Sequence, residues 1–217
     1  MMRLLRYDLL SNEAIQDLSP SFELLTATEH KDGKYRLRRY SIVELLAEPH
    51  MFKALPSNTF MQTDEYNDFQ GNVERKFENI DEYILDGKGM KELIYKFRMM
   101  NKLPVGTPID IHQMRIITLY DETPVSPEGV HRDGYDFIAM IGIARDNIKG
   151  GHLLVYTEQD GDHFMSIPLN AGQMVTLDDT KLWHNASDIQ TVDKTKNGYM
   201  DAFIVTAKIN KKDSVWI

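Results

Sequence analysis

The second half of this chain is a succession of short segments with strand character, separated by turn signals. After Pro104, alternating or β-branched segments cover residues 109–120, 137–144, 152–157, 163–168, 173–177 and 199–208. The turns between them are marked by Gly150-Gly151, Asp160-Gly161-Asp162, Asn170-Ala171-Gly172 and Asn197-Gly198. Many short strands with regularly placed turns are typical of a β-sandwich or barrel. We therefore expect a mainly β fold in which the nearly apolar segment 137–144 is buried on both faces.

The first half of the chain has mixed character. Residues 35–43 alternate and predict a strand, whereas residues 80–101 carry apolar side chains at helical spacing and predict two helices divided near Gly87. Residues 56–79 are polar, aromatic and weakly periodic, which predicts an irregular segment of the length that an active-site lid has. We expect a single domain over residues 1–217, with a helical and mixed elaboration over 1–105 and a β-barrel core over 106–210.

Composition limits the possible partners and the compartment. Hydrophobic residues make up 42% of the chain, which is enough for a sizeable core. The net charge of −8 argues against nucleic acid and against an anionic membrane surface as partners. The absence of cysteine excludes disulfides, iron–sulfur clusters and thiol catalysis, and it fits a cytoplasmic protein. No apolar run reaches the roughly 18 residues of a membrane span, so we expect no membrane association. A homo-oligomer is compatible with this sequence.

Three residues in the β region form a candidate metal site. His131 and Asp133 are two positions apart, so on a strand both side chains point to the same side, and His184 would approach from another strand. Two imidazoles and one carboxylate can hold one face of a divalent ion and leave the opposite face open, as in non-haem iron oxygenases. Fe(II), Mn(II), Ni(II) and Zn(II) all accept this ligand set, so the ligand types alone do not choose the metal.

Other histidines and acids offer competing interpretations. His30 and Asp32 repeat the His-x-Asp spacing, but they lie in a charged stretch before any predicted strand. Asp133 itself has an alternative role as a loop residue that caps a turn before Gly134. His112 either lines the cavity of the barrel or is an ordinary histidine satisfied in its wall.

Several motifs, in a consistent order, resemble one enzyme family. The segments are residues 130–137, 145–151, His184 and residues 199–206, together with residues 35–40 and 111–115. They resemble the 2-oxoglutarate/Fe(II)-dependent dioxygenases that hydroxylate free aliphatic amino acids, the group of the bacterial L-isoleucine dioxygenases. The similarity extends over roughly residues 35 to 208 and is weakest between about 45 and 105.

The resemblance implies both a fold and a reaction. It implies a double-stranded β-helix, that is, a jelly-roll or cupin-like barrel with flanking helices. It assigns His131, Asp133 and His184 to Fe(II) as the catalytic metal ligands. It implies 2-oxoglutarate as co-substrate and metal chelator, dioxygen as oxidant, a small-molecule substrate such as a free L-amino acid, and succinate and CO₂ as co-products.

One position departs from the family pattern. The strand after the distal histidine usually provides an arginine that holds the far carboxylate of 2-oxoglutarate, but Met200 stands at that position. A thioether cannot replace a guanidinium as a carboxylate anchor. Arg115 is the leading substitute, with a surface residue paired to an acid as its alternative role. Arg145 is a weaker candidate, and the Thr206 hydroxyl is a possible additional contact.

Residues for the substrate are less sharply indicated. Alternation on the strand 35–43 places Arg36 and Arg38 on one face and Arg39 on the other, so one of them is a candidate for a substrate carboxylate. Tyr135 or Trp183 is a candidate wall for an apolar side chain. Two other functions stay open at this point: a cupin-like metalloenzyme that does not use 2-oxoglutarate, and a non-catalytic metal-binding barrel.

Overall fold

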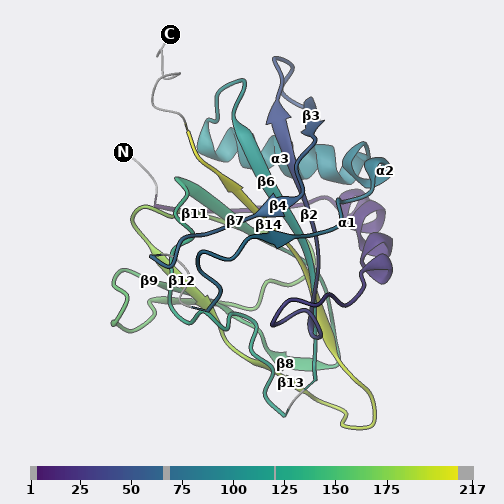
Figure 1. The fold of residues 1–217 in the computed structure, drawn as a ribbon, viewed down its shortest axis with the longest axis vertical. Helices are drawn as coiled ribbons and strands as arrows, with labels where there is room; N and C mark the ends of the chain where they lie inside the picture. Colours follow the sequence, from purple (N-terminus) through teal and green to yellow (C-terminus); the bar gives the residue numbers. More distant parts are fainter. Residues whose placement is uncertain (1–3, 66–68, 120, 210–217) are drawn as a thin grey trace.

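A large antiparallel sheet of seven strands forms the main wall of the molecule, and its arrangement is visible in Figure 1. The computed structural model describes residues 4–65, 69–119 and 121–209. In spatial order the strands are β1 (Leu5–Leu9), β11 (Gln173–Asp178), β7 (Phe137–Asp146), β14 (Tyr199–Ala207), β6 (Pro108–Ile117), β2 (Arg36–Leu45) and β3 (Phe52–Leu55). Strands from both halves of the chain therefore share this one sheet.

Three smaller sheets complete the β structure. Their strands are β10 (Met165–Ile167), β9 (Leu153–Tyr156) and β12 (Trp183–Ala186) in one sheet, β13 (Ile189–Thr191) and β8 (Ile148–Gly150) in the next, and β4 (Thr59–Phe60) and β5 (Arg75–Lys76) in the last. Figure 1 shows β9, β12, β8 and β13 on one side of the large sheet and the helices on the other. Strands folded back against a large sheet in this way form the jelly-roll barrel, so the predicted fold class is confirmed.

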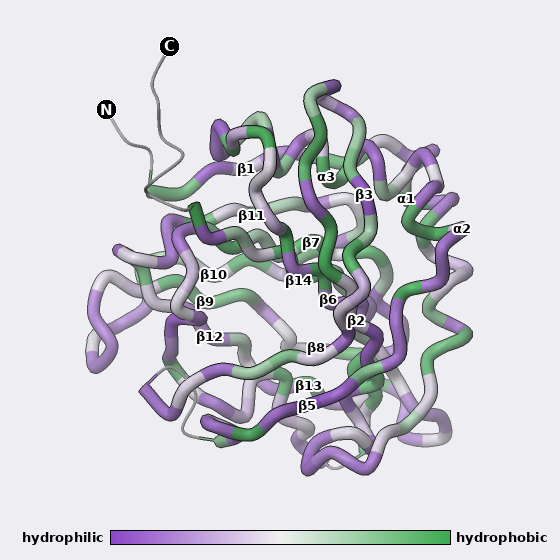
Figure 2. The backbone as a smooth tube through the Cα atoms, turned by 45° about the horizontal axis from the view of Figure 1, so that its top comes forward, coloured by the Kyte–Doolittle hydropathy of each residue, from purple (hydrophilic) through white to green (hydrophobic). Residues whose placement is uncertain are grey.

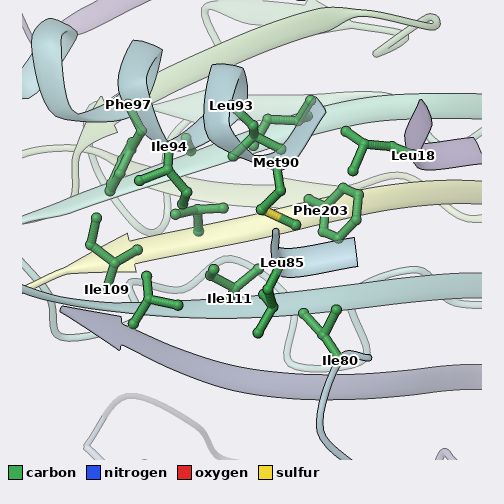
Figure 3. Close-up of a cluster of buried hydrophobic side chains, with 14 of the residues drawn as sticks. Leu18, Ile80, Leu85, Met90, Leu93, Ile94, Phe97, Ile109, Ile111 and Phe203 are labelled. Carbon is green, nitrogen blue, oxygen red and sulfur yellow. The ribbon is translucent and has the colours of Figure 1, made fainter. Parts of the chain in front are cut away.

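The helices cover the outer face of the large sheet. They are α1 (Asn12–Leu18), the 3₁₀ helix η1 (Ser19–Leu24), α2 (Glu82–Leu85) and α3 (Lys88–Asn101). Helix α1 begins where the Ser11 hydroxyl accepts a hydrogen bond from the Ala14 amide, and α3 ends at Lys102, which has a φ of 53°. Figure 3 shows the apolar side chains of α3, among them Leu93 and Phe97, directed toward the sheet, with Met90 next to Phe203. Burial of this face stabilises both layers.

The alternation of side chains divides each central strand between two environments. On β6, Ile109 and Ile111 point into the core beneath α3, whereas His112 and Met114 point into the barrel. Strands β2, β7 and β14 alternate in the same way. On each strand one face points toward the core beneath the helices, and the other points into the barrel, where the cavity-lining residues lie. Figure 2 shows hydrophobic stretches in the central strands β6, β7 and β14 and hydrophilic stretches in many of the connecting loops.

Most of the predicted elements are present, and the departures are local. The strand at 35–43 is β2, and the helical region at 80–101 divides into α2 and α3 at Gly87, as predicted. The segment 56–79 contains two short paired strands, β4 and β5, which its weak periodicity did not predict; its residues 66–68 lie outside the described residues, as does Tyr120 at the end of the predicted strand 109–120. In the described part of the chain, no helix has the length and apolar character needed to cross a membrane.

Candidate active site

His131 and His184 are held together by their own backbones. The amide of His131 donates to the carbonyl of His184 at 2.9 Å, and the amide of His184 donates to the carbonyl of His131 at the same distance. Two residues that exchange both hydrogen bonds in an antiparallel bridge have Cα atoms only about 5.5 Å apart, and their side chains lie side by side. The two imidazole ring centres are accordingly 4.4 Å apart. His184 lies on the strand β12, as predicted, whereas His131 is in a single bridge and Asp133 is outside any strand, so strand alternation does not bring these two residues together.

The turn after His131 is fixed by a buried carboxylate, Asp179. Its oxygens accept hydrogen bonds from the backbone amides of Asp133 at 3.0 Å, Gly134 at 2.9 Å and Tyr135 at 3.1 Å. Gly134 has a φ of 83°, a conformation that a side chain would strain. The chain is therefore bent sharply between the bridge at His131 and the start of β7, and the bend directs Asp133 toward the two imidazoles.

The three ligand atoms lie within 4.8 Å of one another, the separation that a shared ion requires. The Asp133 carboxylate has one oxygen 3.7 Å from Nε2 of His131 and the other 3.3 Å from Nε2 of His184. Nδ1 of His131 lies 2.9 Å from the Gly129 carbonyl, so this nitrogen carries the proton and Nε2 keeps its lone pair for a metal. The residues fit a divalent ion such as Fe(II), with one face of the ion left open.

The charges around the ligands favour the metal-binding protonation states of Asp133 and His131, whereas Asp133 and Asp179 outweigh burial and raise the pKa of His184. Burial opposes the charged form of Asp133, but hydrogen bonds and charges from His184 and His131 outweigh it and lower the pKa of Asp133. Burial and the neighbouring His184 lower the pKa of His131 and keep that imidazole neutral. Gln62 donates from Nε2 to Asp133 Oδ1 at 2.7 Å, which orients the carboxylate. Nδ1 of His184 faces Asp179 Oδ1 at 3.7 Å, from which Asp179 can orient that ring.

A cavity of about 120 Å³ opens beside the three ligands, inside the barrel. This is roughly ten times the space that one water molecule needs, which suits a small organic molecule. Much of its wall is apolar and comes from β6, β7, β9 and β14 and the loop before β11, through Met114, Ile116, Met140, Leu153, Leu169 and Met200. A site of this size and lining accepts aliphatic groups and excludes water.

Three arginines bring positive charge to the cavity, and they differ in their partners. Arg36 pairs with Asp32 at 2.8 Å and with Glu128 at 3.1 Å. Arg38 and Arg75 are 7% and 1% exposed, and neither has a carboxylate at ion-pair distance among residues 4–65, 69–119 and 121–209. A buried guanidinium without an anion is unfavourable, so the cavity is prepared for ligands that carry carboxylates. This arrangement fits 2-oxoglutarate, which has two carboxylates.

Two neutral rings, His112 and Phe60, form part of the cavity wall. His112 lines the cavity, and its ring packs against Tyr40 and Phe60 with centroid separations of 4.7 and 4.5 Å. Burial, together with the charge of Arg38, lowers the pKa of His112 well below its usual value, so this imidazole is neutral. Tyr135 and Trp183, the candidate pocket walls, are not among the residues that line the cavity.

The candidate anchors for 2-oxoglutarate require a correction, beginning with Arg115. Strand alternation places its side chain on the face opposite Met114 and therefore away from the cavity. There it makes a two-pronged ion pair with Asp201, at 2.7 and 2.8 Å, and a further contact with Glu23 at 2.8 Å. The prediction that Arg115 holds the co-substrate is wrong, and the alternative role, a strand arginine paired with acids, is the one observed.

Arg145 and Thr206 also lie outside the cavity lining. Arg145 donates to the carbonyls of Gly150, Gly151 and Pro168, with distances of 3.1 Å to Gly151 and 2.7 Å to Pro168, so its donors already have acceptors. Thr206 is buried on the barrel face of β14, next to the phenol of Tyr135. We assign neither residue to 2-oxoglutarate.

Met200 lines the cavity in an apolar environment, as a member of the cluster that includes Ile116, Val125 and Ile189. The position at which the resemblance predicts the anchoring arginine is thus occupied by a hydrophobic side chain within a hydrophobic cluster. His30, from the second His-x-Asp sequence, is half-buried and lies near Lys76 instead of the metal ligands, and Asp32 serves as the partner of Arg36.

Four functional residues were not anticipated from sequence. Asp179 and Glu128 resemble many other acids in turns, and only their buried positions distinguish them. Gln62 and Arg75 belong to the segment 56–79, where β4 and β5 are too short to reveal which side chains share a face. The one available signal was the presence of an arginine and aromatic residues in a segment expected to cover an active site.

Comparisons with known proteins agree with this geometry. The family model described as 2OG-Fe dioxygenase matches residues 19–206. A sequence comparison with curated proteins gave no match. Among solved structures, a BsmA homologue from Methylobium petroleophilum PM1 is 26% identical, with a TM-score of 0.77 over 90% of this chain and 81% of that one.

Two more distant structures share the fold. IDO from Bacillus thuringiensis is 17% identical, with a TM-score of 0.74 and coverage of 94% of each chain. The Fe(II)/α-ketoglutarate-dependent dioxygenase TqaL is 14% identical, with a TM-score of 0.67 over 97% of this chain and 85% of that one. Because the family model spans most of the chain and the expected metal ligands converge, the protein belongs to the 2OG-Fe dioxygenase family and is an oxygenase that uses Fe(II) and 2-oxoglutarate.

Proposed function

We propose that this dioxygenase hydroxylates a free L-amino acid with an aliphatic side chain. In the family, iron and 2-oxoglutarate together supply the oxidant: one atom of O₂ enters a substrate C–H bond, and the other enters succinate as CO₂ is released. The protein supplies the pocket that chooses the substrate and orients the C–H bond. The proposal therefore depends on which groups line the cavity next to His131, Asp133 and His184.

The observation that carries the proposal is that the cavity presents opposite charges near the metal ligands. Nη2 of Arg75 donates to Oε1 of Gln62 at 3.3 Å, and Gln62 in turn contacts Asp133, so this arginine lies two hydrogen bonds from a metal ligand. Glu128 also lines the cavity. Burial favours the neutral form of Glu128, but the charge of Arg36 outweighs it and lowers the pKa of Glu128.

A free amino acid matches this distribution of charge. Its carboxylate requires a cation, which Arg75 provides, and its ammonium group requires an anion, which Glu128 provides. Its side chain requires an apolar wall, which the methionines and aliphatic residues of the barrel provide. An amide or ester of the amino acid would leave Arg75 without an anion, and an N-acetyl derivative would bring no ammonium group to Glu128.

The test is a set of matched substrates, with succinate formation as the readout. Aliphatic L-amino acids should increase succinate formation above the level without substrate, whereas their amides and N-acetyl derivatives should not. Arg75→Gln should raise the KM for the amino acid by about 10- to 100-fold. Arg39→Gln is the control, because Arg39 lies on the other face of β2 and pairs with Glu78 and Asp81. Equal rates with the acids and their amides would contradict the proposal.

A further inference from the structure

We propose that Arg38 holds the far carboxylate of 2-oxoglutarate, in place of the arginine that the family carries at the position of Met200. In this proposal the anchoring cation lies on β2 instead of β14, two strands away in the same sheet. The inference rests on the co-substrate of the family and not on the amino-acid substrate proposed above. The two ideas can therefore fail separately.

The register of the sheet brings Arg38 close to the vacated position. Across the barrel face, Met200 pairs with Ile116, which pairs with Arg36, and in the next row Ala202 pairs with Met114, which pairs with Arg38. Neighbouring strands are about 4.8 Å apart, so β2 and β14 are separated by roughly 10 Å. Nη2 of Arg38 lies 3.7 Å from the sulfur of Met114, which shows that its side chain leans back over the intervening strand. Arg38, Met114 and Ala202 all line the cavity.

The other arginines near the site either have partners or lie nearer to the metal ligands. Arg36 is paired with Asp32 and Glu128, and Arg145 donates to backbone carbonyls. Arg75 contacts Gln62 and lies over the ring of Phe60 at 4.9 Å, next to the metal ligands and not over β14. Among the residues that the structure describes, Arg38 contacts the sulfur of Met114 and, at 5.2 Å, the ring of Phe77, and it has no carboxylate at ion-pair distance. Of the two cavity arginines on the large sheet, Arg36 is paired with acids, whereas Arg38 has no carboxylate at ion-pair distance among the described residues.

The surroundings of Arg38 also favour an incoming anion. Burial, together with the charge of Arg36, lowers the pKa of Arg38 to about 9, so its positive charge is poorly compensated in the absence of a ligand. A carboxylate that accepts two parallel hydrogen bonds from the guanidinium would satisfy both groups. Such a contact would distinguish 2-oxoglutarate, with its far carboxylate, from a 2-oxo acid that ends in a methyl group.

The experiment measures binding, without turnover. The dissociation constants of 2-oxoglutarate and of 2-oxopentanoate, which has the same chain length but lacks the far carboxylate, are determined for the Mn(II)-loaded protein by calorimetry. The wild-type protein should bind 2-oxoglutarate at least about 100-fold more tightly. In Arg38→Gln, the affinity for 2-oxoglutarate should fall by about 100-fold while that for 2-oxopentanoate is unchanged. Arg38→Lys should give an intermediate loss, because one ammonium cannot form the two-pronged contact.

Controls make the assignment specific. Arg39→Gln, one residue away on the opposite face of β2, should leave both dissociation constants unchanged, and unchanged Mn(II) binding will show that each variant is folded. If Arg38→Gln keeps the wild-type preference for 2-oxoglutarate, the assignment is overturned. A wild-type protein that binds the two acids equally would overturn it without any variant. If Arg75→Gln alone removes the preference, the anchor is Arg75.

Discussion

His131 and His184 face each other across a backbone bridge in which each amide donates to the carbonyl of the other at 2.9 Å. Two distant parts of the chain are therefore joined at the two residues that carry the imidazole ligands. The metal site is built into the hydrogen bonding of the barrel and does not depend on a flexible loop. Such preorganisation means that a ligand can be removed with little effect on the surrounding fold.

His131→Ala and Asp133→Ala should each abolish metal binding and 2-oxoglutarate turnover while the protein stays folded. The reason is that each change removes one of three ligands from an ion with open coordination positions. We expect the affinity for Mn(II), measured by calorimetry, to fall by more than about 100-fold, which exceeds the usual effect of changes around the ligands. His30→Ala, in the other His-x-Asp sequence, is the matched control and should bind metal normally. Turnover in either ligand variant would refute the ligand assignment.

Asp179→Asn should weaken metal binding without removing a ligand. The Asp179 carboxylate accepts the amides of residues 133, 134 and 135 and faces Nδ1 of His184, so its charge sets the position of two ligands. We expect a loss in Mn(II) affinity of about 10- to 100-fold. Asp178→Asn is a suitable control, because that carboxylate bonds to Thr180 at 2.6 Å. Equal losses in the two variants would mean that the effect comes from general destabilisation of the loop.

The fold was predictable because its signals are local: apolar alternation and turn residues identify strands such as β6 and β7. The spacing of His131 and Asp133 is repeated by His30 and Asp32, so the metal ligands were assigned through the resemblance to a family and not by spacing alone. The partner of a side chain is harder to predict when both faces of a sheet are buried. On β6, the helix-facing residues Ile109 and Ile111 are as apolar as Met114 and Ile116 on the cavity face. The sequence pattern therefore could not show on which side Arg115 lies.

Arg38 and Arg75 illustrate the same limit in two ways. Alternation correctly placed Arg36 and Arg38 on one face of β2. The acids that pair with Arg36 are Asp32 and Glu128, and Glu128 is far along the chain. Which arginine is left without an acid depends on tertiary contacts that no periodicity records. Arg75 lies on a strand of two residues, which is too short to show any period.

Arg115→Met should lower stability and leave 2-oxoglutarate binding intact. The change leaves Asp201, which is 2% exposed, as a buried carboxylate without its partner. Removing one member of a buried ion pair costs about 3–5 kcal/mol, which urea denaturation would measure as a lower free energy of unfolding. The double variant Arg115→Met/Asp201→Leu should recover most of this loss, because no charge is left unpaired. A large loss of 2-oxoglutarate affinity in the folded single variant would show that Arg115 reaches the site after all.

His112 should make the stability of the protein depend on pH in the mildly acidic range. Its pKa is lowered from the ordinary value of 6.5 in the folded state, first by burial and then by the charge of Arg38. Below pH 6.5 the unfolded chain therefore binds a proton that the folded protein does not, and stability falls as the pH falls. The contribution of this residue is roughly 1.4 kcal/mol for each pH unit below that value, until the folded protein also takes up the proton.

His112→Leu should reduce this slope in urea denaturation measured from pH 7 to pH 5, with part of the slope retained because the pKa of His131 is also lowered. The exposed His163 gives the control His163→Leu, which should leave the slope unchanged; an unaltered slope in His112→Leu would mean that His112 is protonated in the folded protein.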